Sequence, residues 1–253
     1  MSVAVPPPRA AAGPLVVDRL TRIEGGERLG SLLWRAGPGW RMISSAVLGG
    51  GLGERSWVLN AQVAHGYLRT DPDAHLAELA DASGALGPGV GLMTAADVSA
   101  YGCGHDGGVD AVATAGLRVR GWAAAPSSSP APSSNPAANA AAATATPPGT
   151  INVIVALPVA LTDAALVNAV ATATEAKVQA LLSAGYDCSG TPTDAVCIAV
   201  RTPRDGAEVH PFAGPRSLWG ARLARAVYEA VRTSVPAPCP PGAADLRSPA
   251  STG

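Results

Sequence analysis

The stretch that decides the fold is a short apolar run followed by a long helical pattern: residues 151–157 are INVIVAL, and residues 162–183 are TDAALVNAVATATEAKVQALLS. The first run is rich in β-branched residues and is the strongest strand prediction in the chain. In the second run, Thr162 is a typical N-cap, and Asp163 suits a first helical turn because the helix dipole favours negative charge there. Gly185 is expected to end the helix. The centre of the chain is therefore predicted to be a buried strand followed by a long helix.

Working outward from this unit, further strands are expected before it, and a strand and a helix after it. Strands are predicted at residues 40–48, 56–63, 90–94, 109–117 and 195–200, and helices at residues 73–82 and 217–233. We expect the first two strands to pair antiparallel across a glycine-rich turn. Strands come early and often in adjacent pairs, whereas the long helices come late. This order favours an α+β fold over regular βαβ alternation: a single two-layer domain with a mixed or antiparallel sheet and two long C-terminal helices.

Three stretches rich in Pro, Ala, Ser and Gly divide the chain. Residues 1–14 and 236–253 are predicted to be disordered tails, and residues 123–148 a surface insert, because such compositions bury too little apolar surface to offset the cost of ordering. The folded domain is then residues 15–235. The insert could link two domains or be an overgrown hairpin loop. Strand-like residues on both sides favour the hairpin.

Composition excludes several classes of function. Hydrophobic residues make up 47% and charged residues 15%, which is typical of a globular protein. The net charge of -1, with no basic tract interleaved with aromatic residues, argues against a nucleic-acid partner. No signal peptide is recognisable, and no apolar run approaches the roughly 20 residues of a membrane span. The four cysteines have no paired short spacing, so we predict neither a metal site nor a disulfide framework, and a cytoplasmic location.

The long helix carries the first candidate for chemistry. A polar stripe is expected to border its apolar face, with Lys177 on the other flank. Such a stripe can line a cleft and place Glu175 as a general acid or base. It can equally be the boundary at which the helix meets solvent. The stripe consists of Asn168, Thr172, Glu175 and Gln179, and the apolar face of Val167, Val170, Ala171, Thr174, Val178, Leu181 and Leu182.

Two Gly-Thr steps carry the second candidate. Gly149-Thr150 precedes the strand at 151–157, and Gly190-Thr191 precedes Asp194 and the next strand. A threonine hydroxyl at a strand edge can be a nucleophile if a neighbouring base takes its proton, and Asp194 could be or orient that base. The same residue types are ordinary turn formers. The residues alone leave both interpretations open.

The segments around these candidates resemble the adenosylcobinamide amidohydrolase family. Their order and number across about residues 40–232 make the resemblance specific, although no single piece is a strong motif. The segments are SSAVLGGGLG at 44–53, WVLN at 57–60, GLMTAADV at 91–98, ATAGL at 113–117, GTIN at 149–152, LTDAALVN at 161–168, TATEAK at 172–177 and GTPTDAV at 190–196.

The resemblance implies hydrolysis of the amide between aminopropanol and the corrin ring of adenosylcobinamide, giving adenosylcobyric acid for coenzyme B12 salvage. It implies no resident cofactor, because the cobalt arrives within the corrinoid substrate. It also leaves room for two alternatives: a non-catalytic corrinoid-binding protein, or an amidohydrolase acting on complete cobamides or on another amide.

For the reaction, the resemblance implies Glu175 or Asp194 as acid or base and Lys177 in electrostatic support. A nucleophile at Thr191 or Thr150 is the rival scheme. Hydrogen bonds to the substrate's amides are expected from Asn60, Thr94, Asp97, Asn152 and Asn168.

Overall fold

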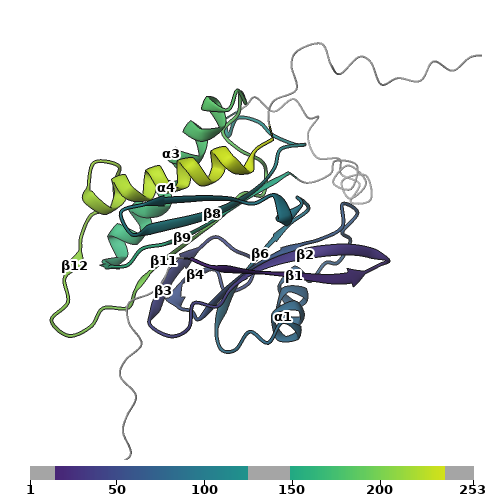
Figure 1. Ribbon diagram of the computed structural model, residues 1–253, viewed down its shortest axis with the longest axis horizontal. Coiled ribbons are helices and arrows are strands. Elements are labelled where there is room, and N and C mark those ends of the chain that lie inside the picture. Colours follow the sequence, from purple (N-terminus) through teal and green to yellow (C-terminus); the bar gives the residue numbers. More distant parts are fainter. Residues whose placement is uncertain (1–14, 125–148, 237–253) are drawn as a thin grey trace, which may run out of the picture.

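The computed structural model describes residues 15–124 and 149–236. They form two main β-sheets and three α-helices (Figure 1). The first sheet has the order β1-β2-β5-β6 and the second the order β4-β3-β11-β9-β8-β7. The first sheet comprises β1 (Val17–Glu24), β2 (Glu27–Trp34), β5 (Trp57–Gln62) and β6 (Gly89–Thr94). The second comprises β3 (Trp40–Ser44), β4 (Gly51–Glu54), β7 (Gly102–Asp106), β8 (Val109–Gly116), β9 (Thr150–Ala156) and β11 (Ala195–Arg201).

Both sheets are mixed, because each contains one parallel pair. β5 and β6 run parallel in the first sheet, and β9 and β11 in the second, while the other neighbours are antiparallel. A small parallel pair of β10 (Ala160–Leu161) and β12 (Val209–His210) lies apart from them. The helices are α1 (Pro72–Ala82), α3 (Asp163–Ser183) and α4 (Leu218–Ser234), with a short 3-10 helix η1 (Val98–Ala100).

The sheets pack face to face, and helices cover their outer faces (Figure 1). Strand alternation builds this arrangement: in β9, Val153 and Val155 face α3 and α4, whereas Ile154 between them faces the other sheet. Every residue of β9 is buried, as expected for a central strand with both faces covered. Trp57 and Leu59 of β5 pack against α1 on the far side of the first sheet.

The α+β class, the mixed sheets and the two long C-terminal helices are as predicted. The number of layers is four instead of two, because a second sheet packs on the first and α1 covers it. The expected pairing of the strands at 40–48 and 56–63 is also wrong: β3 and β5 belong to different sheets, and β3 pairs instead with β4 and β11. The hairpin prediction is confirmed, since β8 and β9 pair antiparallel.

Capping explains where the long helices begin. The side chain of Thr162 accepts a hydrogen bond from the backbone N–H of Ala165, and that of Ser217 accepts one from Gly220. The predicted tails and most of the predicted insert lie outside the described residues. Among the helices of residues 15–124 and 149–236, none is both long and apolar enough to cross a membrane.

The buried face of α3 differs from the one predicted. Val167 and Leu182, which we expected to face the core, are 63% and 48% exposed. The face that packs on the sheet and on α4 is made mainly of alanines, which let the helix approach its neighbours closely, and it includes Lys177. Its buried residues are Ala165, Leu166, Ala169, Thr172, Ala173, Ala176, Lys177, Ala180 and Leu181.

Candidate active site

A cavity of about 630 Å³ opens where the ends of the two sheets meet. Its volume is within the range of small-molecule sites. The loop after β3, the loop between β5 and α1 with the first residue of α1, β6, the start of β9 and the turn before β11 form its wall. The lining residues are Ser45, Ala46, Val47, Val63, His65, Gly66, Tyr67, Leu68, Pro72, Leu92, Met93, Thr94, Ala95, Thr150, Thr193, Asp194 and Ala195.

Asp194 anchors the turn before β11. One carboxylate oxygen accepts hydrogen bonds from the backbone N–H of Ile151, at 2.9 Å, and from the hydroxyl of Thr191, at 2.5 Å. The other accepts from the ammonium of Lys177 and from the backbone N–H of Thr191. The Lys177 and Asp194 side chains are only 8% and 13% exposed. With up to four donors on its two oxygens, Asp194 is a satisfied anion that holds the turn.

Glycine is required beside this ion pair. Gly190 has a φ of 155°, and a Cβ there would lie 2.2 Å from a carboxylate oxygen of Asp194 and 2.6 Å from the Lys177 nitrogen. Any side chain at this position would therefore push the two charged groups apart. The Gly190-Thr191 step of the sequence thus serves the geometry of the ion pair.

Three threonine hydroxyls cluster beside the backbone carbonyl of Gly149, and two of them contact it. Thr193 donates to this oxygen at 2.9 Å, and Thr191 Oγ1 lies 2.6 Å from it; because Thr191 has one hydroxyl proton, it donates either to this oxygen or to Asp194 Oδ1 at any moment. Thr150 Oγ1 lies 2.6 Å from Thr193 Oγ1. Thr150 is 4% exposed and lies on the cavity wall. This cluster joins the start of β9 to the turn before β11, two strands that are parallel neighbours.

A buried amide network lies at the same end of the sheets. Asn152 Nδ2 donates to Asn60 Oδ1 at 2.8 Å and to the carbonyl of Met93, a cavity residue, at 3.0 Å. Asn60 Nδ2 donates in turn to Thr114 Oγ1 at 2.9 Å. Both asparagines are 1% exposed, and Asn152 Oδ1 has no hydrogen-bond partner among the described residues. The network ties β5, β6, β8 and β9 together beside the cavity.

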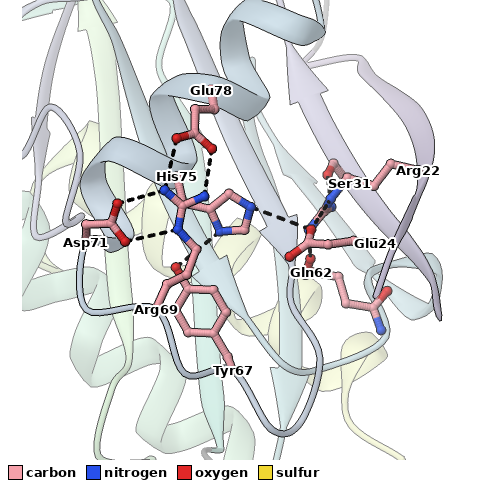
Figure 2. A network of polar contacts seen from close by, with 9 residues as sticks. All are labelled: Arg22, Glu24, Ser31, Gln62, Tyr67, Arg69, Asp71, His75 and Glu78. Atoms are coloured by element: carbon pink, nitrogen blue, oxygen red, sulfur yellow. Dashed lines mark hydrogen bonds and ion pairs between the residues drawn. The ribbon is translucent and has the colours of Figure 1, made fainter. Parts of the chain in front are cut away.

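The loop between β5 and α1 forms the outer rim of the cavity, and Figure 2 shows how it is held. The Tyr67 ring stacks on His75, and its hydroxyl lies 3.1 Å from His75 Nδ1. Arg69 bonds both Asp71 and Glu78, and its guanidinium holds the pKa of each carboxyl below the usual range. These contacts fix a loop whose own residues are largely exposed.

The contacts that hold this loop continue from His75 to the first sheet. Its Nε2 lies 3.5 Å from Glu24 on β1, whose carboxylate pairs with Arg22 at 2.7 Å. Arg22 donates further to the carbonyl of Gln62 at the end of β5, at 2.7 Å (Figure 2). The rim loop is therefore connected to β1 and β5 of the first sheet by side-chain contacts.

The structure brings together some of the residues that the sequence singled out. Asp194, Lys177 and Thr191 are in direct contact, and Thr94 lines the cavity. Asn60 and Asn152 contact each other in the buried network.

Three predicted residues lie elsewhere. Glu175 and Asn168 are exposed on α3, and neither lines the cavity. Asp97 is exposed and caps η1 by accepting from the backbone N–H of Ser99. The positions of Glu175 and Asn168 follow from the burial of the alanine face of α3, which leaves both side chains exposed and buries only Thr172 of the expected stripe.

Sequence reasoning missed several residues of the cavity. Thr193 lies inside the predicted Gly190–Asp194 turn, so its neighbours were the available signal. Ser45, His65 and Tyr67 reach the cavity from loops whose paths depend on sheet packing, and no local pattern marks them. Within residues 15–124 and 149–236, no three His, Cys, Asp or Glu side chains are grouped to hold a metal ion.

Comparison with known proteins gives this geometry a context. A family model described as adenosylcobinamide amidohydrolase matches residues 16–239. The adenosylcobinamide amidohydrolase of Methanosarcina mazei is 30% identical over 197 residues, covering 76% of this chain and 88% of that protein. The protein of the same name from Halobacterium salinarum is 46% identical over 90 residues, covering 35% and 37%. The chain is thus one of the amide hydrolases. It belongs to the adenosylcobinamide amidohydrolase family.

Two solved structures are similar at a lower level. The PH0078 protein from Pyrococcus horikoshii OT3 has a TM-score of 0.44 and 13% identity, covering 86% of this chain and 83% of that one. An L-aminopeptidase D-Ala-esterase/amidase from Ochrobactrum anthropi has a TM-score of 0.39 and 14% identity, covering 90% and 88%. These scores are too low to support an argument about chemistry.

Proposed function

We propose that this protein hydrolyses the amide between aminopropanol and the corrin ring of adenosylcobinamide, giving adenosylcobyric acid, and that the reaction takes place in the 630 Å³ cavity. The observation that carries the proposal is the threonine cluster on the cavity wall, in a chain of this family. An amide hydrolase needs a nucleophile, donors for the developing oxyanion and a proton for the departing amine. Hydroxyls and a satisfied ion pair occur together at one end of the cavity.

Thr150 is the nucleophile in this proposal. Its hydroxyl is on the cavity wall, whereas Thr191 points its hydroxyl at Asp194 and the Gly149 carbonyl and does not line the cavity. Thr193, 2.6 Å from Thr150, is placed to pass on the proton that the nucleophile loses. Asp194 and Lys177 are positioning residues in this proposal, because their ion pair fixes the turn that carries Thr191 and Thr193.

The mouth of the cavity suits the shape of the substrate. Val47 and Leu68 line it and are 56% and 75% exposed, so apolar side chains face solvent at the entrance. We propose that the flat corrin rests on them while the aminopropanol limb enters the cavity. Burial of these side chains by the corrin would contribute on the order of 1 kcal/mol each.

Cobalt enters this scheme as part of the substrate, and no resident cofactor is assigned. A cytoplasmic location belongs to the same proposal. It is supported by Cys103, Cys188 and Cys197, which carry free thiols.

Incubation with adenosylcobinamide, followed by chromatography for adenosylcobyric acid and aminopropanol, tests the proposal. Thr150→Val should abolish product formation, and Thr193→Val should reduce it by about 100-fold if Thr193 carries a proton. Glu175→Gln separates this scheme from the carboxylate scheme: lost activity in Glu175→Gln with retained activity in Thr150→Val would sink the present assignment.

The same assay separates the alternative functions. Tight binding of adenosylcobinamide without product would indicate a corrinoid-binding protein. Cleavage of complete cobamides or of a simple amide, with adenosylcobinamide left intact, would indicate a different amidohydrolase.

A further inference from the structure

The Gly149 carbonyl is placed like a substrate. A backbone carbonyl usually accepts from another backbone group, but this one is approached by two side-chain hydroxyls, at 2.6 Å from Thr191 and 2.9 Å from Thr193. Donors aimed at a carbonyl oxygen stabilise the negative charge that develops when its carbon is attacked. The arrangement resembles an oxyanion site already occupied by the protein's own backbone.

The nucleophile for that carbonyl is the next residue. A hydroxyl has one proton to donate. When Thr193 donates its proton to the Gly149 oxygen, it can only accept in its 2.6 Å hydrogen bond with Thr150. Thr150 is then the donor in that bond. The contacts then form a continuous path from the Thr150 hydroxyl, through Thr193, to the Gly149 oxygen. Proton transfer along this path makes the Thr150 oxygen a stronger nucleophile and, in the same step, neutralises the negative charge on the Gly149 oxygen.

The surroundings hold this arrangement in place. A Cβ on Gly149 would lie 2.4 Å from the Val119 carbonyl oxygen and 2.7 Å from that of Gly116, so position 149 accepts no side chain. On the other side, Asp194 binds the backbone N–H groups of Ile151 and Thr191. Donors and carbonyl are therefore fixed before any reaction, which is the condition for effective electrostatic catalysis.

From these contacts we infer that the protein cleaves its own peptide bond between Gly149 and Thr150. The Thr150 hydroxyl oxygen attacks the Gly149 carbonyl carbon and gives up its proton through Thr193. The tetrahedral centre collapses with rupture of the C–N bond, and the Thr150 nitrogen takes a proton to leave as an amine. The product is an ester between the Gly149 acyl group and Thr150 Oγ1. One water molecule then hydrolyses this ester, leaving a carboxylate on Gly149 and restoring the Thr150 hydroxyl.

This inference rests on the proposed function where it concerns the substrate, and there it supplies a missing group. In the described part of the chain, no carboxylate or imidazole hydrogen-bonds Thr150 in the uncut protein. Cleavage frees the α-amine of Thr150, a group with an ordinary pKa of about 7.7–8.0 that can act as base for its own hydroxyl. Departure of the Gly149 carbonyl also leaves the Thr193 hydroxyl, which lines the cavity, to receive the carbonyl oxygen of the corrinoid amide.

The two fragments would stay together. β9, which begins at the new N-terminus, pairs with β8 of the first fragment over Gly116–Asp110, and β11 of the second fragment pairs with β3 of the first. Both pairings lie inside the second sheet, whose side chains are buried against the helices on one face and against the first sheet on the other. Native size should be unchanged while denatured protein separates into residues 1–149 and 150–253.

Mass spectrometry and N-terminal sequencing of the purified full chain test the inference without any substrate. We expect fragments whose masses sum to the 25.1 kDa chain plus one water, and a new N-terminus reading Thr-Ile-Asn-Val. Thr150→Ser should still be cut, Thr150→Val should remain one chain, and Thr193→Val should cut about 100-fold more slowly. Thr174→Val is the matched control, because that exposed hydroxyl bonds only to the Val170 carbonyl; it should be cut at the normal rate.

A wild-type chain that stays intact on prolonged incubation at neutral pH overturns the inference, as does cutting of Thr150→Val at the same bond, which would indicate a foreign protease. Circular dichroism of each variant shows whether a lack of cutting reflects lost folding, and Thr150→Ser keeps the test decisive if Thr150→Val fails to fold. Self-cleavage without hydrolysis of the corrinoid would refute the proposed function and leave the self-cleavage standing. Hydrolysis of the corrinoid by a chain that stays uncut would refute the self-cleavage and leave the proposed function standing.

Discussion

Replacing either member of the buried Lys177–Asp194 pair should destabilise the fold by very different amounts. Removing one partner of a buried ion pair costs about 3–5 kcal/mol when the other charge is left alone. Asp194→Asn leaves the Lys177 ammonium, at 8% side-chain exposure, without another partner in the described chain, so we expect about 3–5 kcal/mol. Lys177→Met leaves Asp194 with three donors from Ile151 and Thr191, so we expect about 2 kcal/mol.

Urea denaturation of both single variants and the double variant, at constant m-value, measures these costs. The double variant should be destabilised by less than the sum, with a coupling of about 2 kcal/mol. Arg232→Met is the control, because the Arg232–Glu229 pair is 48% and 44% exposed and should be worth at most about 0.5 kcal/mol. If Asp194→Asn costs no more than this control, and the two changes simply add, the description of Asp194 as a buried anchor is refuted.

Three further changes test other parts of the structure. Asn60→Leu strips a partner from the buried amide of Asn152 and should cost about 2–3 kcal/mol of unfolding free energy, measured in urea; a neutral result would show that the amide network is dispensable. Gly149→Ala places a methyl group against two carbonyl oxygens and should lower Tm by a few degrees, corresponding to about 1–3 kcal/mol, whereas Gly121→Ala, with nothing within 4 Å of the new methyl, should leave Tm nearly unchanged. Burial raises the pKa of the Cys197 thiol from 9.0 to about 12, so the stability gained from the neutral thiol is complete below pH 9 and is lost as pH rises from 9 to 12. The stability difference between wild type and Cys197→Ala should therefore shrink over that interval, and a difference that does not vary with pH would contradict the burial argument.

The sequence pattern predicted those features of the fold that depend on interactions between residues close together in the chain. The cap at Thr162, the strand at 151–157 and the hairpin around the insert follow from side-chain hydrogen bonding and β-branched packing, which act over a few residues. Layer number and strand partners follow from contacts far apart in sequence. The pairing of β3 with β11, for example, joins Ser44 to Cys197, and no feature of either strand encodes the other.

The candidate site was predictable to a similar extent. The Gly190–Asp194 turn was singled out because it places a threonine hydroxyl close to a carboxylate at the start of a strand, and the structure brings its Asp194 to Lys177. The role proposed for Glu175 depended on which face of α3 is buried. That choice was decided by alanines, whose burial reflects close packing instead of hydrophobic size, so a pattern weighted by large apolar residues selected the wrong face. Thr193 gained its importance only through its distance to Thr150.

The long-range pairing of β3 with β11 has a consequence for biosynthesis. During translation, β3 and β4 emerge early, but the strand that separates β3 from β9 is among the last segments made. Such non-local pairing is slow, because loop closure is completed before the contacts can form. Thr191, Thr193 and Asp194 come directly before that strand, so the hydroxyls and the anchor of the candidate site reach their positions only when the second sheet closes. In a nascent or truncated chain that lacks β11, these residues would not be held in place. The chemistry of the site would therefore begin only after folding is complete.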